Sequence, residues 1–443
     1  MSDRRQLWGA ETAKAAQNFP ISGEPVPVSV IRWLARLKGA AAVVNGELGL
    51  LPKRTASRIE KAAAEIVAGG HDGQFPIDIF QTGSGTSTNT NANEVIAALA
   101  GSGVHPNDHV NMGQSSNDVF PSAVHLAALD VAQNELLPAL KELERSFARK
   151  SKAFHNVVKA GRTHLMDAVP VTLGQEFAGY AAQMALGGER VRAALVHVGQ
   201  IPLGGTATGT GLNTHPRFAE KVRARLKRES SLKQIAAPLD PFEAQGNRDA
   251  LVELSGALKV IAVSLTKIAG DLALMGSGPR AGLKEIILPE LQKGSSIMPG
   301  KVNPVIAEVV LQVSAQVIGN DTAITVAGMQ GQFELNVRVP VIARNLLESL
   351  HLLSATARVF AEKCVDGIQA NRSGTDASAA ATLATATALN GAIGYDRATV
   401  IVKKATESGR PLRDVALEEG VDAKLYDRTI DLRRIARGNQ AKP

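Results

Sequence analysis

The segment 294–304 carries the side chains best suited to binding a carboxylate and acting on it. It reads Gly-Ser-Ser-Ile-Met-Pro-Gly-Lys-Val-Asn-Pro, so paired serines, a lysine and an asparagine share one short stretch. Its glycines and prolines indicate an irregular backbone, and Pro304 is suited to the first turn of a helix. A helix start attracts anions through its free N–H groups and its dipole. Lys301 is therefore expected to face a bound anion.

Three further segments are rich in Gly, Ser, Thr and Asn. They are residues 83–86 (Gly-Ser-Gly-Thr), 114–118 (Gln-Ser-Ser-Asn-Asp) and 161–164 (Gly-Arg-Thr-His). Hydroxyl, amide and backbone N–H groups at a helix start favour carboxylates. Ser, Asn and Asp are also the preferred N-caps, so simple capping is the better interpretation for Ser116, Asn117 and Asp118 taken alone.

The elements that must position these segments are long helices. Apolar residues from Leu251 to Leu272 recur at alternating spacings of three and four, and similar runs begin at Leu136, Leu173, Ile306 and Leu346. Such seams are typical of helices packed against several neighbours. The sequence predicts a central five-helix bundle that continues across subunits, with a monomeric bundle as the alternative.

The overall fold class is predicted to be mainly α, in three domains. Residues 1–113 form an N-terminal domain of short helices and Gly/Pro/Asn-rich loops, and residues 114–371 form the helical-bundle domain. Residues 372–443 form a small C-terminal helical domain.

Composition limits the compartment and the partners. The 443 residues contain 49 Lys and Arg, 42 Asp and Glu, and one cysteine, for a formal net charge of +7. Cys364 has no intramolecular partner, and neither a signal peptide nor a bilayer-spanning stretch is apparent, so a cytoplasmic protein without a membrane partner is predicted. The sequence lacks basic-aromatic interleaving, which argues against nucleic acid. It also lacks zinc-ligand spacing and a phosphate-binding fingerprint, so neither a metal nor another cofactor is expected.

These motifs resemble the signature segments of the fumarase/aspartase superfamily, specifically those of class II fumarate hydratases. The resemblance covers nearly the whole chain and includes residues 81–86, 89–94, 105–108, 161–168, 203–213, 242–244 and 294–304. It implies a long central five-helix bundle forming a tetrameric helical core. It also implies reversible hydration of fumarate to L-malate, a step of the tricarboxylic acid cycle, through a stabilised aci-carboxylate intermediate and without a cofactor.

The resemblance also assigns roles to residues. Ser295 is expected to be the catalytic base on a mobile loop, and His164 the acid/base group on the hydroxyl side, partnered by Glu308. The expected substrate-binding residues are Ser84, Gly85, Thr86, Ser115, Ser116, Asn117, Thr163, Ser296, Lys301, Val302 and Asn303. A secondary anion site matches His105, Pro106, Asn107 and Asp108, with Ser102 where the family carries an arginine.

Helix length predicts how these segments meet. Consecutive helices usually run antiparallel, so the loops before the Val119 and Leu173 helices should lie at opposite ends. A helix of about 27 residues is roughly 40 Å long, so one subunit cannot bring both loops to one substrate. This agrees with what the resemblance implies, a homotetramer whose active sites are each shared between three subunits.

Two alternative functions stay open. Aspartate ammonia-lyase shares the fold and the 294–304 loop, but aspartases typically carry Gln at the position of His164 and Ala at the position of Gly300. The other alternative is a catalytically inactive structural homologue, although every expected catalytic residue is present.

Overall fold

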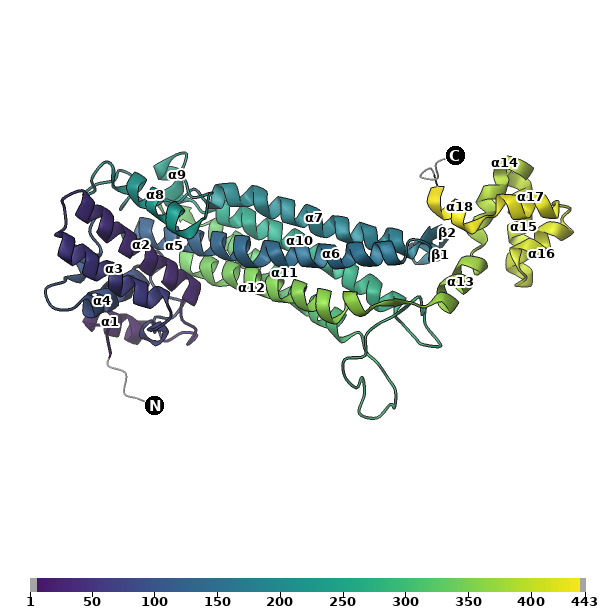
Figure 1. Cartoon of the computed structure of the whole chain (residues 1–443), viewed down its shortest axis with the longest axis horizontal. Helices are drawn as coiled ribbons and strands as arrows, with labels where there is room; N and C mark the ends of the chain where they lie inside the picture. The colour runs from purple at the N-terminus through teal and green to yellow at the C-terminus, as the bar shows by residue number, and fades with distance from the viewer. Residues whose placement is uncertain (1–5, 439–443) are drawn as a thin grey trace. The chain divides into compact units, whose positions relative to one another are not determined.

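The computed structural model describes residues 6–438, and its regular structure is mostly helical. Long helices lie side by side in the middle of the chain (Figure 1). They are α6 (Leu137–Ala153), α7 (Leu173–Val198), α10 (Asp249–Met275), α11 (Val305–Gly328) and α12 (Val339–Lys363). These are the helices predicted from the apolar seams, so the mainly α fold class and its central five-helix bundle are confirmed.

The predicted seams are the buried faces of these helices. Each seam position of α10 from Leu251 to Leu272 is at most 1% exposed. On α11, Val310 and Val317 are buried, whereas Ile306 and Val313 are half-buried. Edge-to-face contacts between aromatic rings join three of these helices. The ring centroid of Phe147 on α6 lies 5.7 Å from that of Tyr180 on α7 and 5.9 Å from that of Phe360 on α12.

The chain divides into two compact units, and the five long helices have residues in both. The first unit comprises the described chain up to Ala139, Gly187–Val263 and Val313–Ala355. Within it, α2 packs against α3, α5 and α8. Its own elements are α1 (Ala10–Asn18), α2 (Val28–Glu47), α3 (Lys53–Val67), η1 (Asp72–Gln74), α4 (Thr86–Ala100), η2 (Pro106–Val110), α5 (Ser116–Val131), η3 (Ala132–Leu136), α8 (Phe218–Ser230), α9 (Pro241–Gly246) and the paired strands β4 (Gly331–Gln332) and β5 (Leu335–Asn336).

The second unit comprises Leu140–Leu186, Ser264–Gln312 and the described chain from Thr356 onwards. It holds two antiparallel pairs, β1 (Val158–Thr163) with β2 (Met166–Thr172), and β3 (Ile286–Ile287) with β6 (Gln369–Ala370). The remaining elements are η4 (Val365–Gly367), α13 (Arg372–Ala381), η5 (Leu383–Leu389), α14 (Asn390–Ile393), α15 (Tyr395–Ser408), α16 (Leu412–Glu418), α17 (Ala423–Thr429) and α18 (Leu432–Arg437). The last helices enclose a small core around Leu389, Ile401 and Val415.

Four of the long helices also carry apolar side chains that this chain leaves exposed. The exposed positions are Leu186 and Val196 on α7, Val260, Val263 and Leu274 on α10, Val309, Leu311, Ile318 and Val326 on α11, and Val359 on α12. Singly exposed apolar residues are ordinary, but helices that are apolar on more than one face usually pack against further helices.

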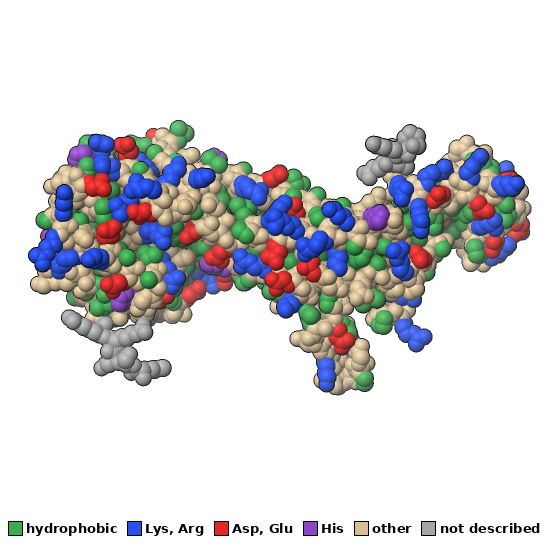
Figure 2. Space-filling view, viewed as in Figure 1, with side chains coloured by type: hydrophobic (Ala, Val, Ile, Leu, Met, Phe, Trp, Pro, Cys, Tyr) green, Lys and Arg blue, Asp and Glu red, His purple; other side chains and the backbone are tan. Residues whose placement is uncertain are grey.

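The surface is mixed in charge. Figure 2 shows basic and acidic side chains interspersed over the visible face. Among the described residues, no helix is long and apolar enough to span a bilayer.

His125 is a buried histidine that joins α5 to the end of α7. Its Nδ1 lies 2.9 Å from the carbonyl oxygen of Val198. Burial, together with the positive charge of Arg248, lowers the pKa of His125 from 6.5 to about 4. The folded chain therefore binds this proton less readily than the unfolded chain does.

This difference predicts that His125 makes an acid-sensitive contribution to stability. Between about pH 6.5 and 4 the unfolded chain holds the His125 proton and the folded chain does not, so this contribution to the free energy of unfolding should fall by up to about 3 kcal/mol as the pH drops. Urea unfolding at fixed protein concentration, with and without the histidine, measures it. His125→Asn, which keeps a donor for Val198 but does not titrate, should change the slope of stability against pH, and His155→Asn at an exposed histidine should not. An unchanged slope in His125→Asn would refute the assignment.

Candidate active site

The first group of predicted site residues lies where α4 and α5 begin. Thr86 Oγ1 is 2.7 Å from Ser84 Oγ and 2.8 Å from Ser116 Oγ, so three hydroxyl groups form a continuous chain. Thr86 is the first residue of α4 and Ser116 the first residue of α5. Two helix N-termini, with their positive dipole ends, therefore meet at one place, which is an arrangement suited to an anion.

Gly85 makes this close approach possible. It has a φ of 75°, in the left-handed region. A Cβ atom at this position would lie 2.2 Å from the ring of Phe120 on α5. Only glycine lets the start of α4 approach the side of α5 this closely.

The start of α5 is a capping box in which Asp118 takes part, as the capping interpretation of residues 116–118 predicted, but the N-cap is Ser115. Ser115 Oγ accepts a hydrogen bond from Asn117 N at 3.2 Å, and Asp118 Oδ1 accepts one from Ser115 N at 2.9 Å. Asn117 Nδ2 donates to the carbonyl oxygen of Ala207 at 2.9 Å. Capping occupies Ser115 and Asp118, whereas the Ser116 hydroxyl stays in the chain with Thr86.

Asp118 also ties this helix start to the glycine-rich segment 203–209. Its Oδ2 accepts hydrogen bonds from Gly204 N at 2.9 Å and Thr206 N at 3.0 Å. Burial raises the pKa of Asp118 to about 6, while the backbone donors and the charge of Lys38 oppose that rise.

Sequence reasoning missed Lys38, which is fully buried on α2. It donates to Asn111 Oδ1 at 3.1 Å and Gln114 Oε1 at 3.2 Å, and so braces the segment that leads into Ser115. Burial lowers the pKa of this lysine to about 7. A lysine inside the apolar face of α2, four residues after Leu34, is the signal that could have found it.

Thr163 and His164 lie at the tip of a β-hairpin, where the sequence had predicted a loop. β1 and β2 are joined at the pair Thr163–Met166, so His164 and Leu165 form a two-residue turn. Their φ values are 55° and 62°, both in the left-handed region that a leucine rarely adopts. The strained tip points its exposed side chains away from the chain's own core.

The 294–304 loop closes on itself. Gly294 N donates to Lys301 O at 2.9 Å, and Asn303 Nδ2 donates to Gly294 O at 2.8 Å. Ser295 Oγ accepts hydrogen bonds from Ile297 N at 3.2 Å and Met298 N at 3.0 Å. The loop therefore surrounds the serine oxygen with N–H donors.

The other predicted residues of this region are exposed. They are Ser296, Lys301, Val302 and, in the first turn of α11, Glu308. Within the described chain, neither a hydrogen bond nor an ion pair joins His164 to Glu308. The hydroxyl chain of Thr86 and Ser116 belongs to the first unit, whereas His164, Ser295 and Lys301 belong to the second.

The predicted secondary anion site forms one turn at η2. His105 Nδ1 accepts a hydrogen bond from Asp108 N at 3.1 Å and lies 3.2 Å from Asp108 Oδ2, while Pro106 and Asn107 begin the turn. The Arg58 side chain donates to the carbonyl oxygens of Ala100 at 2.7 Å and Ser102 at 2.8 Å. A guanidinium group thus reaches the backbone at Ser102 from α3.

Two family models match the chain. Residues 2–319 match a model described as "Lyase", and residues 386–437 match one described as "Fumarase C C-terminus".

Individual proteins match over nearly the whole length. A class II fumarate hydratase of Corynebacterium efficiens is 55% identical over 432 residues, which cover 96% of this chain and 91% of that protein. One of Mycobacterium tuberculosis is 52% identical over 444 residues, covering 98% and 94%. The crystal structure of class II fumarase from Schistosoma mansoni matches with a TM-score of 0.95 at 37% identity, covering 98% of this chain and 96% of that one. With a family match over more than half of its residues and such similarity along its length, the chain belongs to the lyase family that includes the class II fumarate hydratases.

Proposed function

We propose that the chain is a class II fumarate hydratase, which interconverts fumarate and L-malate in the tricarboxylic acid cycle. The setting of Ser295 carries the proposal. Its Oγ accepts hydrogen bonds from two backbone N–H groups, in a loop that also contains Lys301. Donors and positive charge stabilise an alkoxide, and the alkoxide is the form of serine that can remove a proton from carbon.

The reaction can be followed from L-malate. Ser295 takes a proton from the carbon beside one carboxylate, and the electron pair moves onto that carboxylate to give the aci-carboxylate. Lys301 and Asn303 stabilise the added negative charge. His164, partnered by Glu308, then supplies a proton through a bound water to the hydroxyl group. Water leaves, and the electron pair returns to form the double bond of fumarate.

Substrate binding is proposed for the donors that frame these groups. In the first unit they are Ser84, Gly85, Thr86, Ser115, Ser116 and Asn117, and in the second Thr163, Ser296 and Val302 join Lys301 and Asn303. A fumarate carboxylate matches the two converging N-termini of α4 and α5, because both supply N–H groups and positive dipole ends. His105, Pro106, Asn107 and Asp108 are proposed as a secondary anion site.

We also propose a homotetramer in which each active site is shared between three subunits. The exposed apolar positions on α7, α10 and α11 support it, because burial against other chains would remove them from water. So does the hairpin tip, where Leu165 is 74% and Met166 70% exposed.

The alternative substrate, L-aspartate, is less well supported. Gly300 has a φ of 73°, in the left-handed region, so the alanine typical of aspartases would be strained in this loop. A cytoplasmic location is proposed from the buried, unpaired thiol of Cys364, since unpaired thiols are usual in reducing compartments.

The substrate can be tested directly by ultraviolet absorbance of the fumarate double bond. Purified protein should raise the absorbance with L-malate and leave it unchanged with L-aspartate. An absorbance rise with L-aspartate alone would support an aspartate ammonia-lyase. No absorbance change with either substrate would support an inactive structural homologue.

The role of Ser295 can be tested with its neighbour as a matched comparison. Ser295→Ala should lower kcat by about 10²- to 10⁴-fold, the usual contribution of a positioned acid or base. Ser296→Ala should change kcat less than about tenfold, because its proposed role is binding. Steady-state kinetics of both variants checks this, and equal kcat values for Ser295→Ala and the parent would contradict the assignment.

A further inference from the structure

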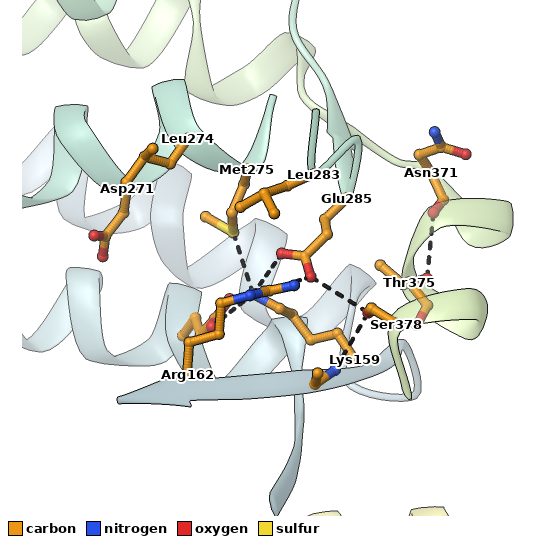
Figure 3. A network of polar contacts seen from close by, with 12 residues as sticks. Lys159, Arg162, Asp271, Leu274, Met275, Leu283, Glu285, Asn371, Thr375 and Ser378 are labelled. Carbon is orange, nitrogen blue, oxygen red and sulfur yellow. Dashed lines mark hydrogen bonds and ion pairs between the residues drawn. The ribbon is translucent and has the colours of Figure 1, made fainter. Parts of the chain in front are cut away.

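Glu285 is a fully buried carboxylate that the reaction described above does not use. Its Oε1 lies 2.7 Å from Arg162 NH1, and its Oε2 lies 2.7 Å from Lys159 Nζ. Figure 3 shows both cations reaching this one side chain from strand β1. Lys159 Nζ also contacts both oxygens of Glu176, at 2.9 and 3.0 Å. Two positive and two negative charges therefore balance in a region that is largely closed to water.

The two cations meet Glu285 where the hairpin is irregular. Side chains alternate along a regular strand, so residues three apart would point to opposite faces. The register of β1 with β2 shifts between Ala160 and Arg162, and such irregularities bend and twist a strand. At Gly161, a Cβ atom would lie 2.6 Å from the carbonyl oxygen of Val169. The irregular register of the hairpin stem thus allows Lys159 and Arg162 to reach the same carboxylate, Glu285.

Glu285 is itself held firmly. Its backbone N–H donates to Met275 O at 2.8 Å, and its carbonyl accepts Asn371 N at 2.9 Å. Ser378 of α13 links Glu285 to strand β1, because its Oγ lies 3.4 Å from Glu285 Oε1 and 3.3 Å from Ala160 N. The carboxylate is therefore a fixed point to which the strand is fastened.

Arg162, which the ion pair with Glu285 holds in place, directly precedes the proposed site residues. Arg162 is followed by Thr163 and His164, and the turn at His164 and Leu165 is strained by two positive φ values. A strained tip keeps one geometry only when its surroundings hold it. No other ion pair fixes the stem of this hairpin as closely to the tip within the described chain.

We propose that Glu285 is a positioning residue for the hydration reaction: its buried ion pairs with Arg162 and Lys159 hold the β1–β2 hairpin so that Thr163 and His164 keep their reactive geometry. The proposal rests on the proposed function, because the rate of hydration is one of its two readouts. The second readout, hydrogen exchange in the hairpin, is independent of activity.

Glu285→Gln removes the charge and nearly preserves the shape. It should speed hydrogen–deuterium exchange in the peptide 158–172, and should lower kcat by about 10- to 100-fold, since misplacement of a reacting group by about 1 Å has effects of this size. KM for fumarate should change less than about threefold, because the substrate donors outside the hairpin are untouched. Asp366→Asn is the matched control, because it breaks an arginine–carboxylate pair of 2.7 Å that is exposed, and it should change neither readout.

Arg162→Met is a second test variant, to be used if Glu285→Gln does not fold. It is the milder change, because Glu285 stays paired with Lys159. It should reproduce the faster exchange and the lower kcat. Because Glu285 acts partly through Arg162, the loss of kcat in the double variant should be smaller than the product of the two single losses, and a fully multiplicative loss would contradict the proposal.

Unchanged exchange at 158–172 in folded Glu285→Gln or Arg162→Met would overturn the proposal. Faster exchange spread evenly over the chain, with kcat lowered only in proportion to the folded fraction, would also overturn it. If the parent protein does not hydrate fumarate, the proposed function fails, and the exchange comparison still decides whether Glu285 holds the hairpin.

Discussion

The long helices carry apolar side chains that this chain leaves exposed, and the proposed arrangement of the active site depends on this feature. Their seams pack inward, as the burial of Leu251 to Leu272 shows, yet α7, α10 and α11 keep valines, leucines and an isoleucine exposed. Association with further copies of the chain would bury these side chains. Residues at the ends of the same helices would then be brought together from different chains, and neither unit would need to contain a whole active site.

Each of the two groups of proposed site residues is held by contacts within its own unit. Gly85 leaves room for the ring of Phe120, which lets the starts of α4 and α5 lie together, and Lys38 holds the segment that leads into Ser115 through Asn111 and Gln114. In the second unit, Glu285 fastens the stem of the hairpin. In both groups, buried charged side chains hold the backbone that carries the residues proposed to touch substrate. Such support keeps donors preorganised for a developing negative charge.

Sequence reasoning found the helices because apolar residues at strict spacings of three and four form a continuous stripe only on a helix. It also anticipated capping among residues 116–118, and Asp118 does take part, although the N-cap itself is Ser115. It missed the hairpin, since the turn at His164 and Leu165 lacks the Asn-Gly or Asp-Gly signal of two-residue turns. It missed the roles of Lys38 and Glu285 because their partners are distant in sequence: Arg162 and Glu285 are 123 residues apart. Such pairs follow from the tertiary fold and leave little local pattern.

The claim that sites are shared between chains is tested most directly by mixing two damaged proteins. Asn117→Ala damages the first group and Ser295→Ala the second. Unfolded together and refolded, they should regain fumarate hydration well above either variant refolded alone, because some sites take Asn117 from one chain and Ser295 from another, both intact. A mixture no more active than its parents, although mass measurement shows mixed oligomers, would mean that one chain supplies both residues and would contradict the shared-site arrangement.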